Sequence, residues 1–246
     1  MFVQKKKLDP KRARILDDFQ KNLDIRFRDI ALLNLAFFHR SVVNEMGKTD
    51  QAHVLCNERL EFLGDTVLDM VVATYLFKNL TNEPEGVLSQ IKSLVVSEPC
   101  LAKIALEIGE DDCLVLGHGE EASGGRKKKA ILADCVEAII GAYYLDCGIK
   151  ETEKFILKLI VPKIDEVLTR TKNEQLDSKS ALQEWFQKSE KQCPKYILEK
   201  TEGPDHDKVF YVKVVLGSKE FGPATGKSKK EAEQNAAKIA IEKLGI

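Results

Sequence analysis

The chain has 246 residues, 43% of them hydrophobic, which is enough for one large domain or two smaller ones with apolar cores. Its formal net charge of -1 excludes a polycation, so any positive surface for nucleic acid has to be local. No apolar run approaches the roughly 20 residues that span a bilayer, and the first residues lack the apolar segment of a signal peptide.

Cysteine usage indicates a reducing compartment. The six cysteines are scattered and no pair has C-x-x-C spacing, so neither a zinc site nor a disulfide framework is expected. We predict reduced, mostly packed thiols in a cytoplasmic protein without a membrane partner.

The first 40 residues read as a basic arm followed by helices. Residues 1–14 carry six basic side chains and one acid, so they form either a solvated arm or a contact for RNA. Ile15, Phe19 and Leu23 fit an amphipathic helix, and residues 30–38 fit a second one. His39-Arg40-Ser41 follows, and we interpret His39 as a structural or capping histidine.

Residues 57–77 place three carboxylates inside an apolar helical pattern. Apolar side chains recur there at three- and four-residue spacing, which predicts a buried helix. Glu58, Glu61 and Asp65 fall on one stripe of that helix. Like charges roughly 4 Å apart repel by about 4 kcal/mol near a protein surface, and Arg59 is the only cation inside the segment. A metal ion among the oxygens is favoured over ion pairing within this segment.

The next segments are shorter. Pro84 suits the first turn of a helix that runs to residue 96, and residues 99–106 predict another. Residues 109–129 are rich in glycine and charge and read as the longest irregular stretch.

A second apolar segment, residues 131–146, is again interrupted by acids. Asp134 and Glu137 are three residues apart and therefore on one helix face. Small residues such as Ala138 and Gly141 allow close packing against another helix. All candidate ligands in the two segments are carboxylate oxygens, which selects Mg²⁺ or Mn²⁺ over zinc.

The C-terminal part changes character. A helix over residues 151–168 is followed by the polar, aperiodic stretch 169–177, which we interpret as an interdomain linker. A helix (178–189), three short strands (196–200, 209–216 and 219–221) and an Ala-rich helix (229–244) complete the order α-β-β-β-α.

Several motifs resemble the ribonuclease III family of double-stranded-RNA endonucleases. The run N-E-R-L-E-F-L-G-D (57–65) resembles the signature of this family. Further similarity to the family lies in E-G-V-L-S (85–89), G-H-G-E-E (117–121) and A-D-C-V-E-A (133–138). The tail resembles a double-stranded-RNA-binding domain in A-L-Q-E-W (181–185), G-P-D-H (203–206) and G-K-S-K-K-E-A (226–232). Ala130 stands where the family usually has serine, for which we expect at most a tuning effect.

The resemblance implies an α + β chain with an all-α nuclease domain, residues 1–172, and a double-stranded-RNA-binding domain, residues 176–246. It implies hydrolysis of phosphodiesters in duplex RNA, leaving 5′-phosphate and 3′-hydroxyl ends with short 3′ overhangs. Carried over by position, the metal ligands are Glu61, Asp65, Asp134 and Glu137, with Asp65 and Glu137 the most critical. Mg²⁺ is the expected metal, and Mn²⁺ can substitute for it.

Further roles are implied for side chains around this set. Glu58 and Glu85 would support it, whereas Asp69 and Asp146 would lie outside it. The residues implied for RNA binding are Gln183, Glu184, His206, Lys227, Lys229 and Lys230, and binding should weaken with added salt. The family works as a homodimer, with Phe62 at the interface.

The short chain, with one copy of each domain, resembles the bacterial form of the family, whose substrates are precursors of ribosomal RNA and some messenger and transfer RNA. A second hypothesis is a catalytically inactive protein that binds double-stranded RNA. A metal phosphohydrolase of small molecules is a third, but it leaves the tail domain unexplained.

Overall fold

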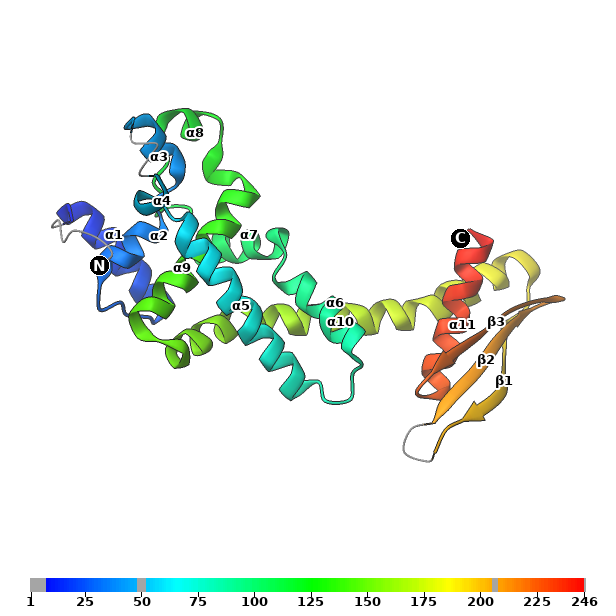
Figure 1. Cartoon of the computed structure of the whole chain (residues 1–246). Coiled ribbons are helices and arrows are strands. Elements are labelled where there is room, and N and C mark those ends of the chain that lie inside the picture. Colours follow the sequence, from blue (N-terminus) through cyan, green and yellow to red (C-terminus); the bar gives the residue numbers. More distant parts are fainter. Residues whose placement is uncertain (1–7, 48–51, 205–207, 246) are drawn as a thin grey trace. The chain divides into compact units, whose positions relative to one another are not determined.

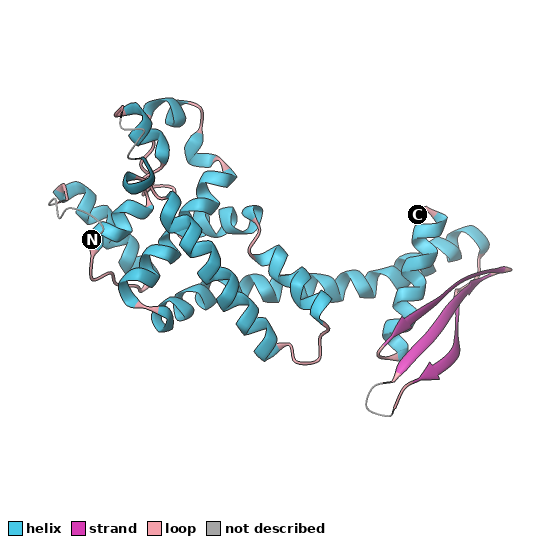
Figure 2. Ribbon diagram, viewed as in Figure 1, coloured by secondary structure: helices cyan, strands magenta, loops and turns pink. Residues whose placement is uncertain are grey.

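The computed structural model describes residues 8–47, 52–204 and 208–245, and the chain divides into two compact units, Met1–Val167 and Leu168–Ile246. The first unit is helical and the second combines helices with a small sheet (Figures 1 and 2). The helices of the first unit are α1 (Pro10–Leu23), α2 (Ile30–Ala36), α3 (Arg40–Glu45), α4 (Ala52–Leu55), α5 (Glu58–Asn79), α6 (Glu85–Val95), α7 (Glu98–Glu107), α8 (His118–Ala122), the 3-10 turn η2 (Gly125–Lys127) and α9 (Lys129–Cys147). The helix α10 (Ile149–Glu190) contributes residues to both units.

The core of the first unit lies around α5 and α9, which pack against each other. Eleven of the nineteen residues of α9 are buried, and they are spread around its circumference. A helix that is apolar on all sides has to be enclosed by neighbours, which here include α2, α5 and α7. The apolar periodicity therefore predicted both central helices correctly.

The first helix begins after a side-chain cap. Asp9 accepts hydrogen bonds from the backbone amides of Lys11 and Arg12, and Pro10 occupies the first helical position, where it costs no hydrogen bond. Phe19 packs edge-on against Phe37, with ring centroids 5.1 Å apart. Residues 1–7 of the predicted basic arm lie outside the described residues.

The irregular stretch predicted at residues 109–129 is wrong in part, and the stretch interpreted as a linker, residues 169–177, is helical. Residues 109–129 contain α8 and η2, and residues 169–177 are helical within α10. The first error arises because side chains from elsewhere in the chain bond to the backbone of α8, as shown below. The second arises because a polar helix carries no apolar stripe for periodicity to detect.

The second unit has the predicted order. Its strands β1 (Lys195–Glu202), β2 (Val209–Leu216) and β3 (Lys219–Gly226) form an antiparallel sheet in the order β1-β2-β3, followed by α11 (Lys229–Leu244). Alternate residues of β2 are buried, as the period of two requires. They pack with Leu182 and Phe186 of α10 and with four alanines of α11, whose small side chains let the helix lie close to the sheet.

In the described part of the chain, no helix is long and apolar enough to cross a membrane. The six cysteines are free thiols, and three of them are buried.

Candidate metal centre and RNA-binding surface

Two glycines bring α5 and α9 into direct backbone contact. A Cβ atom on Gly64 would overlap the carbonyl of Glu137, and a Cβ on Gly141 would overlap the carbonyl of Leu60. Any larger residue at either position would push the helices apart. Gly141 was among the small residues predicted to allow close packing. Gly64 was not, although a glycine inside an apolar helix is itself a signal of close approach.

This crossing brings three of the four predicted ligands together. One carboxylate oxygen each from Glu61, Asp134 and Glu137 lies within 4.8 Å of the other two, and all three side chains are half-buried. Glu61 precedes Gly64 by one helical turn, and Glu137 is the residue that Gly64 touches. The close contact of the helices is therefore what makes the cluster of carboxylates possible.

Burial and mutual repulsion make these carboxylates hard to ionise. Burial, followed by the charges of Asp134, Glu58 and Asp65, raises the pKa of Glu61 to about 7. Burial and then Asp65, Asp134, Glu61 and Asp69 raise the pKa of Glu137 to about 8. The pKa of Asp134 is also raised, first by burial and then by Glu98. Ionising these three carboxylates in the folded chain therefore costs free energy.

The donor set fits a hard divalent cation. Among the described residues, no lysine or arginine forms an ion pair with Glu61, Asp134 or Glu137. Three carboxylate oxygens from two helices are typical ligands for Mg²⁺ or Mn²⁺. A bound cation would replace the repulsion with attraction and lower the raised pKa values.

Asp65 stands apart from the three clustered side chains. It is exposed and lies outside the 4.8 Å group, yet its charge contributes to the raised pKa values of both Glu61 and Glu137. The structure therefore places it beside the cluster rather than within it.

The neighbouring acids have other partners. Glu58 pairs with Arg40 at 2.8 Å, Asp69 pairs with Lys92 at 2.6 Å, and Glu85 accepts a hydrogen bond from Ser89. Asp146 accepts hydrogen bonds from two backbone amides, as expected for a capping residue. Glu98, whose charge acts on Asp134, was missed because no sequence spacing relates it to either signature.

The described RNA-binding residues predicted in the second unit lie on α10 and around the start of α11. Gln183 and Glu184 are exposed on α10, and Lys227, Lys229 and Lys230 are exposed around the start of α11. His206 lies outside the described residues. The α11 terminus is held by a variant of the capping box, in which Ser228 accepts from the Glu231 amide and the Glu231 carboxylate accepts from the amide of Lys227, the residue before the cap. This arrangement presents the lysines beside the positive end of a helix dipole.

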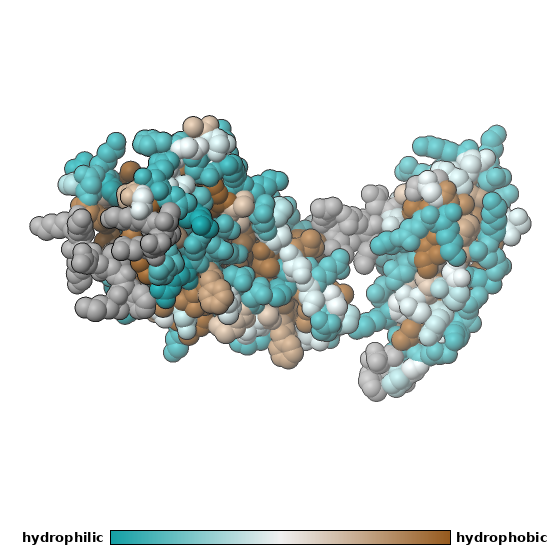
Figure 3. Space-filling view, turned by 45° about the horizontal axis from the view of Figure 1, so that its top comes forward, coloured by the Kyte–Doolittle hydropathy of each residue, from teal (hydrophilic) through white to brown (hydrophobic). Residues whose placement is uncertain are grey.

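Phe62 is exposed at the surface of the first unit. Its side chain is 78% accessible, whereas sequence periodicity alone would make it a core aromatic. Beside it lies a groove of about 590 Å³ lined mainly by apolar residues, including Leu32, Leu35, Val54, Leu60, Leu63 and Leu145. Figure 3 shows hydrophobic side chains reaching an otherwise largely hydrophilic surface.

The chain joins a helical unit that carries a cluster of oxygen ligands to an α-β-β-β-α unit with exposed lysines. This combination defines a class of metal-dependent nucleases that act on paired RNA. Comparison with protein families agrees: residues 29–164 match the Ribonuclease-III-like model, and residues 178–244 match the double-stranded RNA binding motif. The chain belongs to the ribonuclease III family, which implies a divalent metal.

Individual relatives extend over nearly the whole chain. "Ribonuclease 3" of Treponema denticola is 51% identical over 99% of this chain and 97% of its own length. "Ribonuclease 3" of Borreliella afzelii is 45% identical over 93% of this chain and 91% of its own length. A solved nuclease domain of ribonuclease III from Campylobacter jejuni is 38% identical and covers 59% of this chain and 95% of its own, with a TM-score of 0.54.

Proposed function

We propose that the chain is an endoribonuclease that hydrolyses the phosphodiester backbone of double-stranded RNA with the help of Mg²⁺. The products would carry 5′-phosphate and 3′-hydroxyl ends with short 3′ overhangs. The observation that carries the proposal is the cluster of Glu61, Asp134 and Glu137, with no cationic side chain paired to it in the described residues.

Four carboxylates would hold the metal: Glu61, Asp65, Asp134 and Glu137. When bound, Mg²⁺ supplies Lewis-acid activation of the phosphate and lowers the pKa of water, and Mn²⁺ can take its place. Asp65 lies close enough for its charge to raise the pKa of both glutamates. A change of its side-chain rotamer would complete the ligand set. Glu58 and Glu85 would support the negative potential around the ligands.

The second unit would recognise the duplex by its shape. A-form RNA hides its bases in a deep major groove, so a protein reads phosphates and 2′-hydroxyls across the minor groove. Gln183, Glu184 and His206 would supply polar groups to the minor groove. The lysines at positions 227, 229 and 230 would contact phosphates, and affinity should therefore fall steeply with salt.

Dimer formation is the third part of the proposal. An exposed phenylalanine beside an apolar groove on the same surface is suited to a two-fold interface, where Phe62 of each copy enters the groove of the other. The Campylobacter jejuni structure is described as containing a region involved in dimer formation of its nuclease domain. Two copies would bring two carboxylate clusters, one for each RNA strand.

The biological substrates would be precursors of ribosomal RNA and some messenger and transfer RNA precursors in the cytoplasm. The relatives of nearly equal length that bear the ribonuclease 3 name support this proposal.

The deciding experiment is cleavage of a long RNA duplex in Mg²⁺ by the full chain and by Glu137→Gln, with duplex binding measured by gel shift in Ca²⁺. The proposal expects staggered cuts by wild type, and loss of cutting with retained binding for the variant. Binding without any cutting by wild type would instead favour an inactive RNA-binding protein. The double-stranded RNA binding motif at residues 178–244 argues against a small-molecule phosphohydrolase, which has no use for it.

A further inference from the structure

The two helices that carry the carboxylate cluster begin without caps of their own. The side chains at the N-cap positions, Asn57 for α5 and Lys128 for α9, make no capping hydrogen bond, and at α5 only the thiol of the preceding Cys56 lies against the Glu58 amide among the described residues. A helix start without a side-chain cap has backbone amides that depend on other partners, and contacts with neighbouring segments then help to fix its position. What fixes these two starts therefore matters for the positions of Glu61, Asp134 and Glu137.

A single segment, residues 37–45, bonds to the start of α5. We call it the clamp segment. The carbonyl of Phe38 accepts a hydrogen bond from the Asn57 amide at 2.9 Å. Arg40 pairs with Glu58, the first residue of α5, at 2.8 Å. The clamp segment thus adds one backbone bond and one ion pair to the start of α5, where Asn57 itself supplies no side-chain cap.

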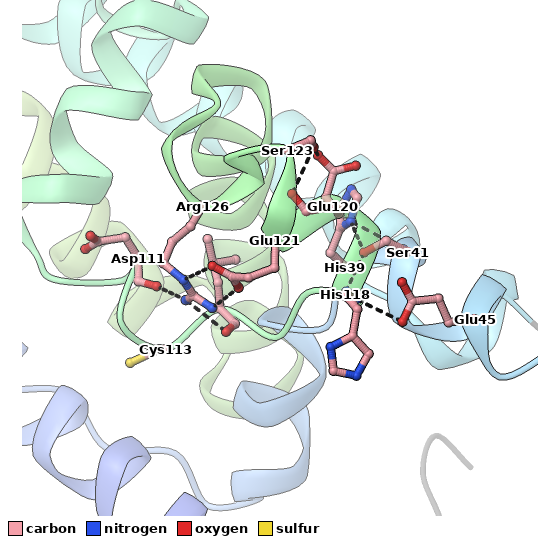
Figure 4. Close-up of polar contacts among 12 residues, drawn as sticks. His39, Ser41, Glu45, Asp111, Cys113, His118, Glu120, Glu121, Ser123 and Arg126 are labelled. Atoms are coloured by element: carbon pink, nitrogen blue, oxygen red, sulfur yellow. Dashed lines mark hydrogen bonds and ion pairs between the residues drawn. The ribbon is translucent and has the colours of Figure 1, made fainter.

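The same segment bonds to the chain that leads into α9. Phe38 forms an isolated bridge with Val115, in which the Phe37 carbonyl accepts from the Val115 amide and the His39 amide donates to the Val115 carbonyl. Glu45 accepts from the amides of His118 and Gly119 at 2.9 and 3.0 Å (Figure 4). Both amides belong to the first turn of α8, so Glu45 acts as its cap from another part of the chain.

From α8 the connection continues to α9 through ion pairs. Glu120 pairs with Lys128, the residue before α9, at 2.6 Å. Glu121 pairs with Arg126, whose guanidinium also donates to the carbonyls of Asp111 and Leu114 (Figure 4). The start of α9 is therefore tied to α8, and α8 is tied to the clamp segment.

Ser41 connects His39, in the clamp segment, to Gly117, the residue before α8. Its Oγ accepts a hydrogen bond from the Gly117 amide at 2.8 Å, so its own proton is available to His39 Nδ1, 2.9 Å away. The Ser41 amide donates to the same Nδ1, which confirms His39 as the N-cap of α3. Burial lowers the pKa of His39 and favours the neutral ring, whose single Nδ1 lone pair is shared by the Ser41 hydroxyl and amide. A Cβ on Gly117 would lie 2.8 Å from the Ser41 carbonyl, so only glycine allows this approach.

We infer that Ser41 is a positioning residue for the metal centre: it locks the clamp segment to the loop before α9 and so fixes the two carboxylate-bearing helices relative to each other. The inference rests on the proposed function for the identity of the metal site. Groups that bond directly to metal ligands contribute roughly 10–100-fold to metal affinity, and Ser41, which bonds to His39 and Gly117 instead, should contribute at or below the lower end of that range. Small displacements of the ligands also lower turnover more than they lower substrate binding, because binding of the duplex uses other residues.

The test is Mn²⁺ binding by the full chain, measured by titration calorimetry, together with cleavage kinetics. Ser41→Ala should raise the Mn²⁺ dissociation constant roughly 10-fold and lower kcat, with little change in KM for the duplex. Ser41→Thr keeps the hydroxyl and should restore both values. Ser189→Ala removes a hydroxyl that donates to the Phe186 carbonyl, outside the clamp segment, α8 and the start of α9, and should leave Mn²⁺ affinity near wild type.

Unchanged Mn²⁺ affinity in Ser41→Ala would overturn the inference, as would an equal loss in Ser41→Ala and Ser41→Thr. If Ser41→Ala does not fold, Glu45→Ala decides, because it removes the other two bonds between the clamp segment and α8 and should weaken Mn²⁺ binding similarly. Failure of the proposed function looks different: wild type would bind Mn²⁺ more tightly than Ser41→Ala, yet neither would cut RNA.

Discussion

Glu61 and Glu137 keep their protons at pH values where exposed glutamates are ionised. Their pKa values are about 7 and about 8 in the folded chain, against 4.5 for an ordinary glutamate. Between these pKa values the folded state holds protons that the unfolded state has released. The contribution of the two glutamates to the free energy of unfolding is therefore fully present below about pH 4.5 and is lost as pH rises through their folded pKa values. A metal ion needs the ionised oxygens, so its affinity rises over the same interval.

The melting temperature of the metal-free chain should therefore fall between about pH 5 and pH 9, and saturating Mn²⁺ should reverse most of the fall. For a chain of this size, each kcal/mol corresponds to roughly 2–4 °C. Scanning calorimetry with and without Mn²⁺ measures both effects. Glu137→Gln supplies the control, since it lacks one titrating group and should show a flatter pH profile and a smaller shift with metal. A metal-induced shift as large at pH 5 as at pH 9 would contradict the linkage.

Asp65 and Asp69 form a matched pair of acids one turn apart on α5. Asp69 pairs with Lys92 and is the smallest of the charges that raise the pKa of Glu137, whereas Asp65 raises the pKa of both Glu61 and Glu137. Asp65→Asn should reduce cleavage of duplex RNA by about 10–100-fold or more, and Asp69→Asn should leave it within a few-fold of wild type. Single-turnover rates in Mg²⁺ measure the difference. Equal losses in the two variants would mean that only the total negative charge matters.

At the scale of whole elements, the crossing of α5 and α9 is the feature on which the metal centre depends. Gly141→Ala would place a methyl group against the Leu60 carbonyl and 3.0 Å from the Gly64 amide. Overpacking of this kind costs about 1–3 kcal/mol, and the separated helices would hold Mn²⁺ less tightly. Thermal melts and Mn²⁺ titration should show both losses.

Gly86→Ala is the control for that substitution. It lies in α6 with nothing within 4 Å of the added Cβ, so stability should be unchanged or slightly higher. If Gly141→Ala melted and bound Mn²⁺ as Gly86→Ala does, the close contact of α5 and α9 would not be what positions the ligands.

Elements with strong local signals were predictable from the sequence. The bounds of β2 and α11 agree with the prediction, and α5 differs by one or two residues at each end, because apolar periodicity reports a buried face directly. The helix α8 was not predictable, since its first turn is satisfied by Glu45, more than 70 residues earlier in the chain. The convergence of Glu61, Asp134 and Glu137 followed from the family resemblance, whereas the separate place of Asp65 and the influence of Glu98 depend on distances in space.

At the scale of the whole molecule, the part of the chain that the structure describes carries one carboxylate cluster, but cutting a duplex requires two strand scissions. A dimer with an isologous interface supplies a second cluster at a fixed spacing, which would set the stagger of the cuts. Phe62 is the residue on which we expect this interface to depend, because a large exposed aromatic next to an apolar groove is costly in a monomer.

Phe62→Glu should convert the protein to a monomer in sedimentation velocity, because a buried charge at the centre of an interface costs several kcal/mol. The monomer should still bind duplex RNA, since the predicted binding residues lie in the other unit. Double-strand cuts, seen on native gels, should fall far more than single-strand nicks, seen on denaturing gels, because one cluster can reach only one strand at a time. Leu106→Glu, at another exposed apolar position on α7, should leave the dimer and the staggered cuts intact. A Phe62→Glu variant that still sediments as a dimer would place the interface elsewhere, and a monomer that still makes staggered double-strand cuts would separate cleavage from dimer formation.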